Sequence, residues 1–375
     1  MAQILVITWD GGGNVPPMLG IAGELRRRGH HVRVLGHRQQ RDVVAAAGLE
    51  FVAYSHTRPW SPEEPATGIR FLLKFLFGVF TNPRIGDDVR SELTRKPVDL
   101  AVVDSMTLGA LRATERAGLP TAVLMHSLHR YHTHNWSHGP IGIVAALRGM
   151  RPGRLWNTAD RVLVATDREL DPVGNRLPTN VRYTGVVQTK PHHNAPGETP
   201  LVLVSLSTIY FEGQAAALQA ILDALAGLPL RAIITTGAVE PRTLTAPPGV
   251  ELHRYIPHEE IMPSASLVIG HGGHSTTMRA LAHDLPLLIL PMHPMLDQPM
   301  IGKAVAAAGA GRVLPRTARP DEIRKALNAL LQDEQYRAAA ATIGNRLRSR
   351  NGANIAADEL ECLLSTQEKA AGPAV

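Results

Sequence analysis

The segment Leu267–Leu281, LVIGHGGHSTTMRAL, places two histidines, three glycines and three hydroxyl-bearing residues between apolar residues. Leu267–Ile269 predict a short buried strand, and Thr277–Ala282 predict a helix with Met278 and Leu281 on one face. Glycines at the turn let a ligand approach the backbone, and the start of a helix offers unpaired N–H groups with a partial positive charge. This combination predicts an anion site, with phosphate as the expected anion.

Three further segments combine a predicted strand with polar or aromatic residues at its end: VSLST (Val204–Thr208), RYIPH (Arg254–His258) and LPMHPMLDQP (Leu290–Pro299). Loops that follow parallel strands meet at one edge of a sheet. Together the four segments offer a flat ring for a base, amides and hydroxyls for a diphosphate, and a carboxylate and an amide for a sugar. Each residue also has a plain structural alternative, such as a core tyrosine or a helix cap. The ring is that of Tyr255. The candidate diphosphate residues are Thr208, Gly272, Gly273, Ser275 and Thr276, and the candidate sugar residues are Asp297 and Gln298.

The elements that must position these loops alternate between strand and helix along the whole chain. Strands are predicted at Ile4–Thr8, Val32–Gly36 and Asp99–Asp104, with helices between them, which indicates a parallel α/β sheet. A polar, Pro-rich stretch interrupts the pattern, which then restarts at Leu201–Ser205. We therefore predict a first domain over 1–187, a linker over 188–199 and a second domain over 200–350. A C-terminal helix and tail over 351–375 could pack back on the first domain.

Composition excludes several classes of protein. The net charge is +6, but the basic residues are scattered, whereas a nucleic-acid binder concentrates them on one element. Cys362 is the one cysteine, so an internal disulfide and a cysteine-based zinc site are excluded. No run of eighteen apolar residues predicts a membrane span, and the start MAQILVITWDGG lacks the basic region of a signal peptide. We expect a cytoplasmic protein.

The order and spacing of the four loops resemble the donor-binding signature of GT-B glycosyltransferases, specifically the family-1 nucleotide-sugar-dependent enzymes. The chain is most similar to the bacterial enzymes that glycosylate antibiotics and other natural products, and the resemblance is strongest over Val250–Leu314. It implies an α/β GT-B fold, in which two Rossmann-like, doubly wound parallel-sheet domains face a cleft and C-terminal helices follow. It also implies an inverting enzyme that moves a sugar from a dTDP- or UDP-sugar to a small, largely apolar acceptor, without a metal or a cofactor.

The resemblance assigns a role to each loop. Tyr255 would stack on the base and the Ile256 backbone would bond it; Thr208 would lie near the phosphates; Asp297 and Gln298 would contact the sugar. The diphosphate would meet the segment that comprises His271, Gly272, Gly273, His274, Ser275 and Thr276. Two positions depart from the family pattern. Ser207 replaces the usual glycine before Thr208, and Arg279 stands where plant-type members carry a ribose-binding glutamate, so dTDP fits at least as well as UDP.

The position of the family's general base holds Asn14, which is a more serious departure. An amide does not accept a proton at useful pH, and general-base help is worth ~10²–10⁴-fold. Asp104 matches the acid that orients the missing histidine. Three explanations stay open: another residue is the base, the acceptor ionises readily, or the protein is catalytically weak. The candidate bases are Asp10, Asp104 and the histidines of HSLHRYHTH, namely His126, His129, His132 and His134, although that cluster could also be a plain surface loop.

An aromatic segment in the first half is the candidate acceptor site. Gly68–Phe80, GIRFLLKFLFGVF, is predicted to be helical and holds four of the six phenylalanines. It could line an apolar substrate cleft or simply pack on the core. In the first case the acceptor would contact Trp60, Phe71, Phe75 and Leu76.

Two other functions remain as alternatives to sugar transfer. One is an auxiliary or scaffold protein that keeps the nucleotide-sugar site without turnover, and the other is a sugar-nucleotide epimerase on the same fold. The expected partners are the donor and the apolar acceptor, with no nucleic acid and no membrane span. A homodimer stays an open expectation.

Overall fold

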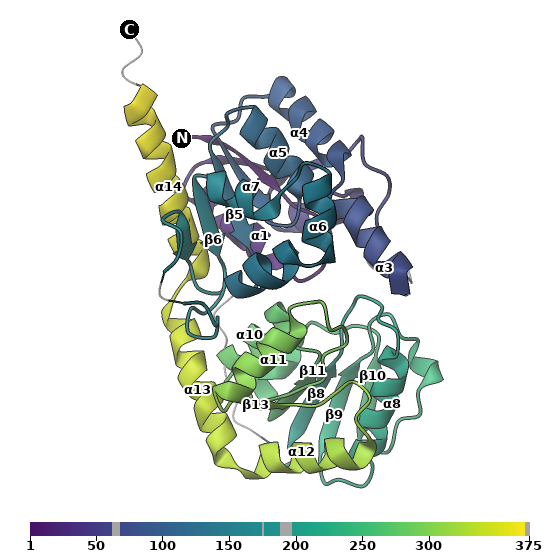
Figure 1. The fold of residues 1–375 in the computed structure, drawn as a ribbon. Coiled ribbons are helices and arrows are strands. Elements are labelled where there is room, and N and C mark those ends of the chain that lie inside the picture. The colour runs from purple at the N-terminus through teal and green to yellow at the C-terminus, as the bar shows by residue number, and fades with distance from the viewer. Residues whose placement is uncertain (62–67, 175, 188–196, 372–375) are drawn as a thin grey trace. The chain divides into compact units, whose positions relative to one another are not determined.

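The computed structural model describes residues 1–61, 68–174, 176–187 and 197–371, which form two compact units (Figure 1). Among these residues, the first unit holds 1–61, 68–174, 176–187 and 350–371, and the second holds 197–349. Most of the predicted linker, 188–196, lies outside the described residues. Both units are parallel α/β structures, as the resemblance implies.

The first unit contains a seven-stranded parallel sheet in the order β3-β2-β1-β4-β5-β6-β7 within the described residues. Its central strands are apolar runs that are buried on both faces, because helices cover both sides of the sheet (Figure 1). The strands are β1 Gln3–Ile7, β2 His31–Gly36, β3 Glu50–Ala53, β4 Leu100–Asp104, β5 Thr121–Met125, β6 Arg161–Val164 and β7 Val181–Tyr183. The helices are α1 Val15–Arg27, α2 Arg41–Ala46, α3 Gly68–Phe75, α4 Pro83–Arg95, α5 Leu108–Arg116, α6 Pro140–Leu147 and α7 Pro152–Thr158.

The second unit repeats this design around a six-stranded parallel sheet in the order β10-β9-β8-β11-β12-β13, again within the described residues. The strands are β8 Leu201–Ser205, β9 Arg231–Thr235, β10 Val250–His253, β11 Leu267–Gly270, β12 Leu287–Ile289 and β13 Gly311–Val313. The helices are α8 Gln214–Leu225, α9 His258–Ile261, α10 His274–Ala282, α11 Gln298–Ala307, α12 Pro320–Gln332 and α13 Glu334–Ser349. None of the helices within the described residues is long and apolar enough to cross a bilayer.

Several element boundaries differ from the sequence prediction. Helix α10 starts at His274, three residues before the predicted Thr277, so the second histidine of the glycine-rich turn is helical. The predicted helix over Gly68–Phe80 does form, but it widens into a π-helical segment, η2, over Leu76–Phe80. A second π-helical segment, η3, spans Tyr131–Trp136 in the histidine-rich loop.

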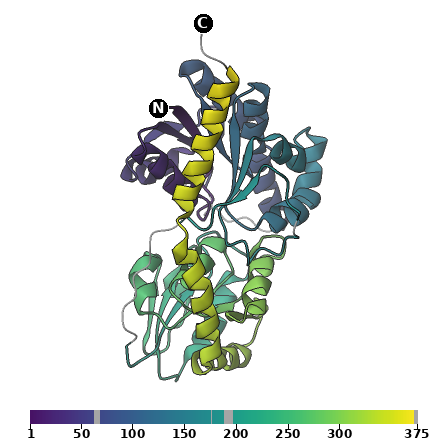
Figure 2. The ribbon, with the colours of Figure 1, turned by 90° about the vertical axis from the view of Figure 1, so that its left-hand side faces the viewer.

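The last helix, α14 (Gly352–Ala371), follows the whole second unit in sequence but packs on the first, against α1 (Figure 2). It adds Ala356, Ala357, Leu360 and Leu363 to the core cluster beneath β1 and α1. The Arg28 guanidinium at the end of α1 pairs with Asp358 at 2.6 Å and with Glu361 at 2.7 Å. Apolar burial and ion pairs therefore both fix α14 to the first unit.

Candidate active site

Three polar residues gather where β1, β4 and β5 end, and these strands are neighbours in the first sheet. Asn14 precedes α1 in the loop after β1, Asp104 is the last residue of β4, and His126 follows β5 directly. The strand order reverses between β1 and β4, and parallel α/β sheets bind ligands at such reversals. The structure thus brings together three of the residues that the sequence analysis considered for catalysis.

The Asp104 carboxyl lies at the centre of this group and is fully buried. Its Oδ1 accepts a hydrogen bond from the Met106 amide at 2.9 Å, and its Oδ2 accepts one from Asn14 Nδ2 at 2.9 Å. Burial raises the pKa of Asp104 to about 6, and the hydrogen bonds from Met106 and Asn14 oppose that rise. Because both oxygens are engaged and the side chain is 0% exposed, Asp104 is poorly placed to touch an acceptor itself.

Asn14 holds the first loop to this carboxyl. Its Nδ2 also donates to the Trp9 carbonyl at 2.8 Å, and its Oδ1 accepts from the Gly11 amide at 3.1 Å. The side chain occupies the N-cap position of α1 but makes no capping hydrogen bond. Asn14 therefore acts as a donor toward Asp104.

His126 also approaches this carboxyl. Its Nδ1 lies 3.6 Å from Asp104 Oδ2. That nitrogen is buried without a hydrogen-bond partner among the described residues, while the side chain as a whole is 14% exposed. Burial lowers the pKa of His126 to about 4, so the ring is neutral at pH 7.

The other histidines of this loop lie in different surroundings. His132 is fully buried and its ring centre is 6.0 Å from that of His126, whereas His134 is exposed. His129 is buried, and its backbone amide donates to Asp171 Oδ2 at 2.6 Å. The Asp171 carboxylate therefore holds the loop in place, and a plain surface loop describes His134 alone.

The predicted acceptor residues turn out to be packed inside the first unit. Trp60, Phe75 and Leu76 are buried, and the Trp60 ring centre lies 5.1 Å from that of Phe75 and 5.9 Å from that of Trp9. The side chain of Phe71 lies outside the described part of the structure. The packing of these three side chains favours the core interpretation of the segment, because the face that the sequence analysis assigned to the acceptor is turned inward.

Other apolar side chains of the same region remain exposed. Leu73 and Phe77 lie four residues apart and are 40% and 45% exposed. Helix α6 adjoins η2, and the Arg148 guanidinium at its end lies 5.2 Å from the centre of the Phe77 ring. We call the set Leu73, Phe77, Ile143 and Leu147 the exposed apolar patch.

The second sheet reverses its strand order between β8 and β11, and the loops after both strands carry predicted donor residues. Thr208, after β8, is exposed. Ser207 before it has φ 131°, a conformation that favours glycine. The Ser207 hydroxyl accepts a hydrogen bond from the Ile209 amide at 3.0 Å. The serine that replaces the family glycine thus keeps a glycine-like backbone.

The loop after β11 holds His271 in front of α10. Gly272 has φ 82°, and a side chain there would come within 2.9 Å of the Gln298 carbonyl oxygen, so only glycine fits. Burial lowers the pKa of His271 to about 4, while the Ser205 carbonyl opposes the shift. His274, Ser275 and Thr276 form the first turn of α10, with His274 buried and the hydroxyl residues half-buried. The start of this nine-residue helix can accept an anion.

Tyr255 and Ile256 follow β10, one strand beyond β9. Tyr255 is 69% exposed, so it is available for stacking and is not a core tyrosine. Ile256 is half-buried. Arg279, on α10, is close enough to His258 to add to the lowering of that histidine's pKa, which burial mainly causes. The loop after β10 and the helix after β11 are therefore near neighbours.

Gln298 and Asp297 begin α11, and the structure separates their roles. Gln298 is buried, and its Oε1 accepts hydrogen bonds from the amides of Met292 at 2.7 Å and His293 at 3.1 Å. This oxygen shapes the loop after β12. Asp297 is half-buried at the N-cap position without a side-chain capping bond, so capping does not explain it.

Comparisons with known proteins bear on the enzyme class of this chain. The family model described as "Erythromycin biosynthesis protein CIII-like, C-terminal domain" matches residues 219–363, and the model "Glycosyl transferase 4-like domain" matches residues 12–186. The chain is 27% identical to 4'-demethylrebeccamycin synthase of Lentzea aerocolonigenes, over 97% of this chain and 100% of that protein. The chain is a GT-B glycosyltransferase.

Solved structures show the same fold for this glycosyltransferase. The glycotransferase of kitacinnamycin superimposes with a TM-score of 0.79 at 22% identity, over 97% of this chain and 99% of that one. Glycosyltransferase VinC in complex with dTDP gives a TM-score of 0.74 at 17% identity, over 97% of this chain and 100% of that one.

The sequence analysis of this glycosyltransferase missed one cation near the donor loops. Arg316 follows β13, and its Nη1 donates to the Glu212 carbonyl at 2.8 Å and to the Met292 carbonyl at 3.2 Å. It therefore ties the loop before α8 to the loop after β12. The available signal was its place after a strand of the same sheet, which the analysis did not use.

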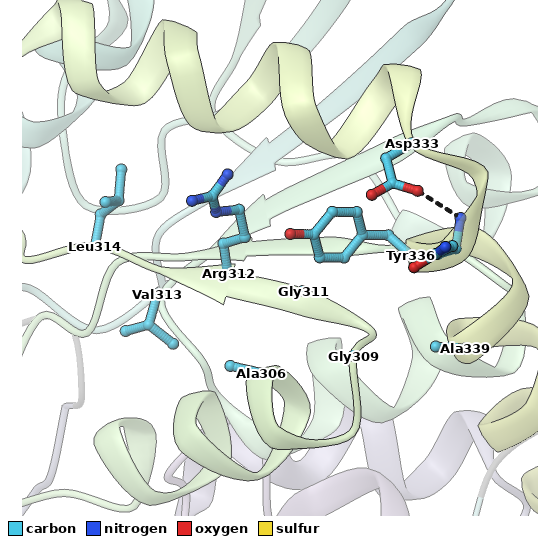
Figure 3. A pocket seen from close by; sticks show the side chains of 10 residues that line it. Ala306, Gly309, Gly311, Arg312, Val313, Leu314, Asp333, Tyr336 and Ala339 are labelled. Carbon is cyan, nitrogen blue, oxygen red and sulfur yellow. Dashed lines mark hydrogen bonds between the residues drawn. The ribbon is translucent and has the colours of Figure 1, made fainter.

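A hollow of about 620 Å³ lies elsewhere on the second unit of the glycosyltransferase, along the edge strand β13 (Figure 3). The Tyr336 ring points toward Arg312 there, and the Gln335 amide donates to Asp333 Oδ1 at 3.0 Å. No predicted donor residue lines this hollow, so we assign it no part in sugar transfer.

Proposed function

We propose that this enzyme is an inverting glycosyltransferase that moves a sugar from a nucleoside diphosphate, dTDP in preference to UDP, to a small apolar natural product. The presence of all the predicted donor loops at the carboxyl ends of strands in the second sheet, on both sides of its strand reversal, carries the proposal. The exposed Tyr255 ring, the start of α10 and the neutral His271 offer a base platform and diphosphate donors. The likeness to VinC with dTDP and the presence of Arg279 in place of a ribose-binding glutamate support dTDP.

The groups collected in the first unit support inversion. A single displacement requires removal of the acceptor proton, whereas retention through a covalent sugar requires an accessible nucleophile. The Asp104 carboxyl is fully buried, which disfavours attack on a sugar, but it can support proton transfer. The exposed apolar patch supports an apolar acceptor, because contiguous exposed apolar side chains mark binding surfaces. Neither the epimerase nor the scaffold alternative is favoured by the relatives.

Replacing His271 tests the donor site. We expect His271→Ala to lower affinity for dTDP by ~1.5–3 kcal/mol, because a strong hydrogen bond to phosphate is lost. Calorimetry with dTDP and UDP would measure it. His253→Ala is the matched control, since this partly exposed histidine faces Glu251 at 3.4 Å. Unchanged dTDP affinity in His271→Ala would count against the site.

The stereochemistry of transfer tests the reaction class. Wild-type enzyme supplied with dTDP-α-glucose should give a β-glucoside, as the anomeric proton coupling in an NMR spectrum of the product would report. An α-glucoside would refute the inverting mechanism. Faster turnover with UDP-glucose than with dTDP-glucose would refute the stated nucleotide preference.

A further inference from the structure

We propose that His126 removes the acceptor proton and that Asp104 positions its ring, so that the base comes from the end of β5 and not from the loop that holds Asn14. This assignment rests on the transfer reaction proposed above. The carboxylate expected behind the family's base is present as Asp104. The imidazole that faces it belongs to His126.

Geometry distinguishes His126 from the other candidates. Asp104 is fully buried and both of its oxygens already accept hydrogen bonds. The His132 ring is also fully buried, whereas the His126 side chain is 14% exposed. The His126 Nδ1 is buried and unpartnered among the described residues, and it lies 3.6 Å from Asp104 Oδ2. A small ring movement would close that distance, and contacts of this kind tighten in the reactive complex.

The hydrogen-bond roles fit a neutral histidine that is ready to accept a proton. With Nδ1–H directed at Asp104, the tautomer is fixed and Nε2 keeps its lone pair. Asn14 Nδ2 donates to the same Asp104 oxygen, which holds the carboxylate toward the ring. The carboxylate then stabilises the imidazolium that forms, as the orienting acid does in a Ser-His-Asp triad.

The step balances without a further reactant. The acceptor oxygen forms a bond to the anomeric carbon while the bond from that carbon to the diphosphate oxygen breaks. The electron pair of the broken bond leaves with the nucleoside diphosphate. The acceptor proton ends on His126 Nε2, and bulk solvent removes it before the next turnover.

A matched pair of acceptors tests the base. With dTDP-glucose as donor, we expect His126→Gln to lower kcat for 2-naphthylmethanol by ~10²–10⁴-fold, with KM for the donor unchanged. The loss should be smaller for 2-naphthol, because a phenol ionises more readily than an alcohol. His138→Ala, at an exposed histidine shortly after the same loop, should keep the wild-type rate. Added imidazole should partly restore His126→Gly, as it would not for a purely structural role.

A second variant tests the positioning role of Asp104. Asp104→Asn should lower kcat for 2-naphthylmethanol by ~10²-fold or more, since the new amide favours the wrong tautomer. NMR titration of the His126 ring should show a lower pKa in this variant. The titratable groups facing His126 are Asp104 on β4 and His132 in its own loop, so His132→Asn is titrated as well.

The outcomes distinguish the assignment of the base from the sugar-transfer reaction on which it rests. Full activity of His126→Gln on 2-naphthylmethanol would overturn the base assignment and leave sugar transfer standing. A His126 titration that does not change in Asp104→Asn would overturn the pairing. Wild-type enzyme that transfers sugar to neither acceptor would overturn the transfer function and this assignment with it.

Discussion

At the strand reversal of the first sheet, Asn14 and Asp104 are buried and hydrogen-bonded to each other, whereas at the reversal of the second sheet Thr208 faces solvent, as does Tyr255 after the edge strand β10. Both places arise from the same topology, because the strand order turns back between β1 and β4 and between β8 and β11. The topology therefore provides the location but not the chemistry.

The difference follows from what each site must do. Proton transfer gains from a dry site, where burial shifts pKa values and fixed hydrogen bonds hold the groups. Binding a large anionic nucleotide requires surface that water can leave when the ligand arrives. The buried carboxyl with its neighbouring imidazole suits the first task, and the exposed ring, hydroxyls and helix start suit the second.

The largest expected effect is a pH dependence of stability that belongs to the first site. Because burial raises the pKa of Asp104 from 3.8 to about 6, the folded state binds this proton more tightly than the unfolded chain. This proton adds about 3 kcal/mol to the free energy of unfolding. The contribution is complete below pH 4 and is lost as the pH rises through 6. Asp104→Asn should remove that dependence.

Urea unfolding at pH 4, 5.5 and 7 would measure this change. All four tryptophans, Trp9, Trp60, Trp136 and Trp156, lie in the first unit, so their fluorescence reports on that unit alone. The exposed Asp42→Asn is the control. If the free energy of unfolding changed equally with pH in Asp104→Asn and in wild type, the proposed contrast between a buried and a solvent-exposed site would be wrong.

An intermediate effect is expected at the exposed ring of the second site. Tyr255→Ala should weaken dTDP binding by ~1–3 kcal/mol, the usual cost of losing a stacked base. Its melting temperature should match that of wild type, because the ring is 69% exposed. Calorimetry and a thermal scan would measure the two quantities. Tyr255→Phe should bind like wild type, and an equal loss in both variants would argue against stacking.

The smallest effect is expected at Ser207, where the second site carries backbone strain. Because Ser207 has a φ of 131°, Ser207→Gly should relieve strain and raise the free energy of unfolding of the second unit by ~1 kcal/mol. Loss of the hydrogen bond from the Ile209 amide to the serine hydroxyl offsets part of this gain. Far-UV circular dichroism during heating would measure this change in stability. Ser266→Gly, which lacks a positive φ, should destabilise instead. A less stable Ser207→Gly would show that the strain is absent.

The sequence was sufficient to predict the α/β sheets and the position of the candidate donor loops after their strands. Parallel strands buried on both faces read as apolar runs, and loops after such strands must meet at one edge. The meeting of Asn14 and Asp104 was predictable for the same reason, because β1 and β4 are neighbours. The restarted pattern after the linker region indicated a second unit.

Side-chain direction within loops was beyond the sequence. Nothing in HSLHRYHTH shows that Asp171, which follows β6, holds the His129 amide, or that the His126 ring faces Asp104. The Gln298 oxygen is used by its own loop, which its family role does not reveal. The sequence could not decide between a cleft and a core position for the aromatic helix, because a run that is apolar all round does not indicate which side is covered.

The return of α14 to the first unit affects the order in which the protein can fold during synthesis. The second unit is continuous over 197–349 of the described residues, so it can fold once that stretch has left the ribosome. The core under β1 and α1 must wait for Leu360 and Leu363, although most of its strands are made first. A nascent chain stalled before α14 would expose that apolar surface to chaperones. The usual N-terminal-first sequence of domain folding is thus reversed for the last step.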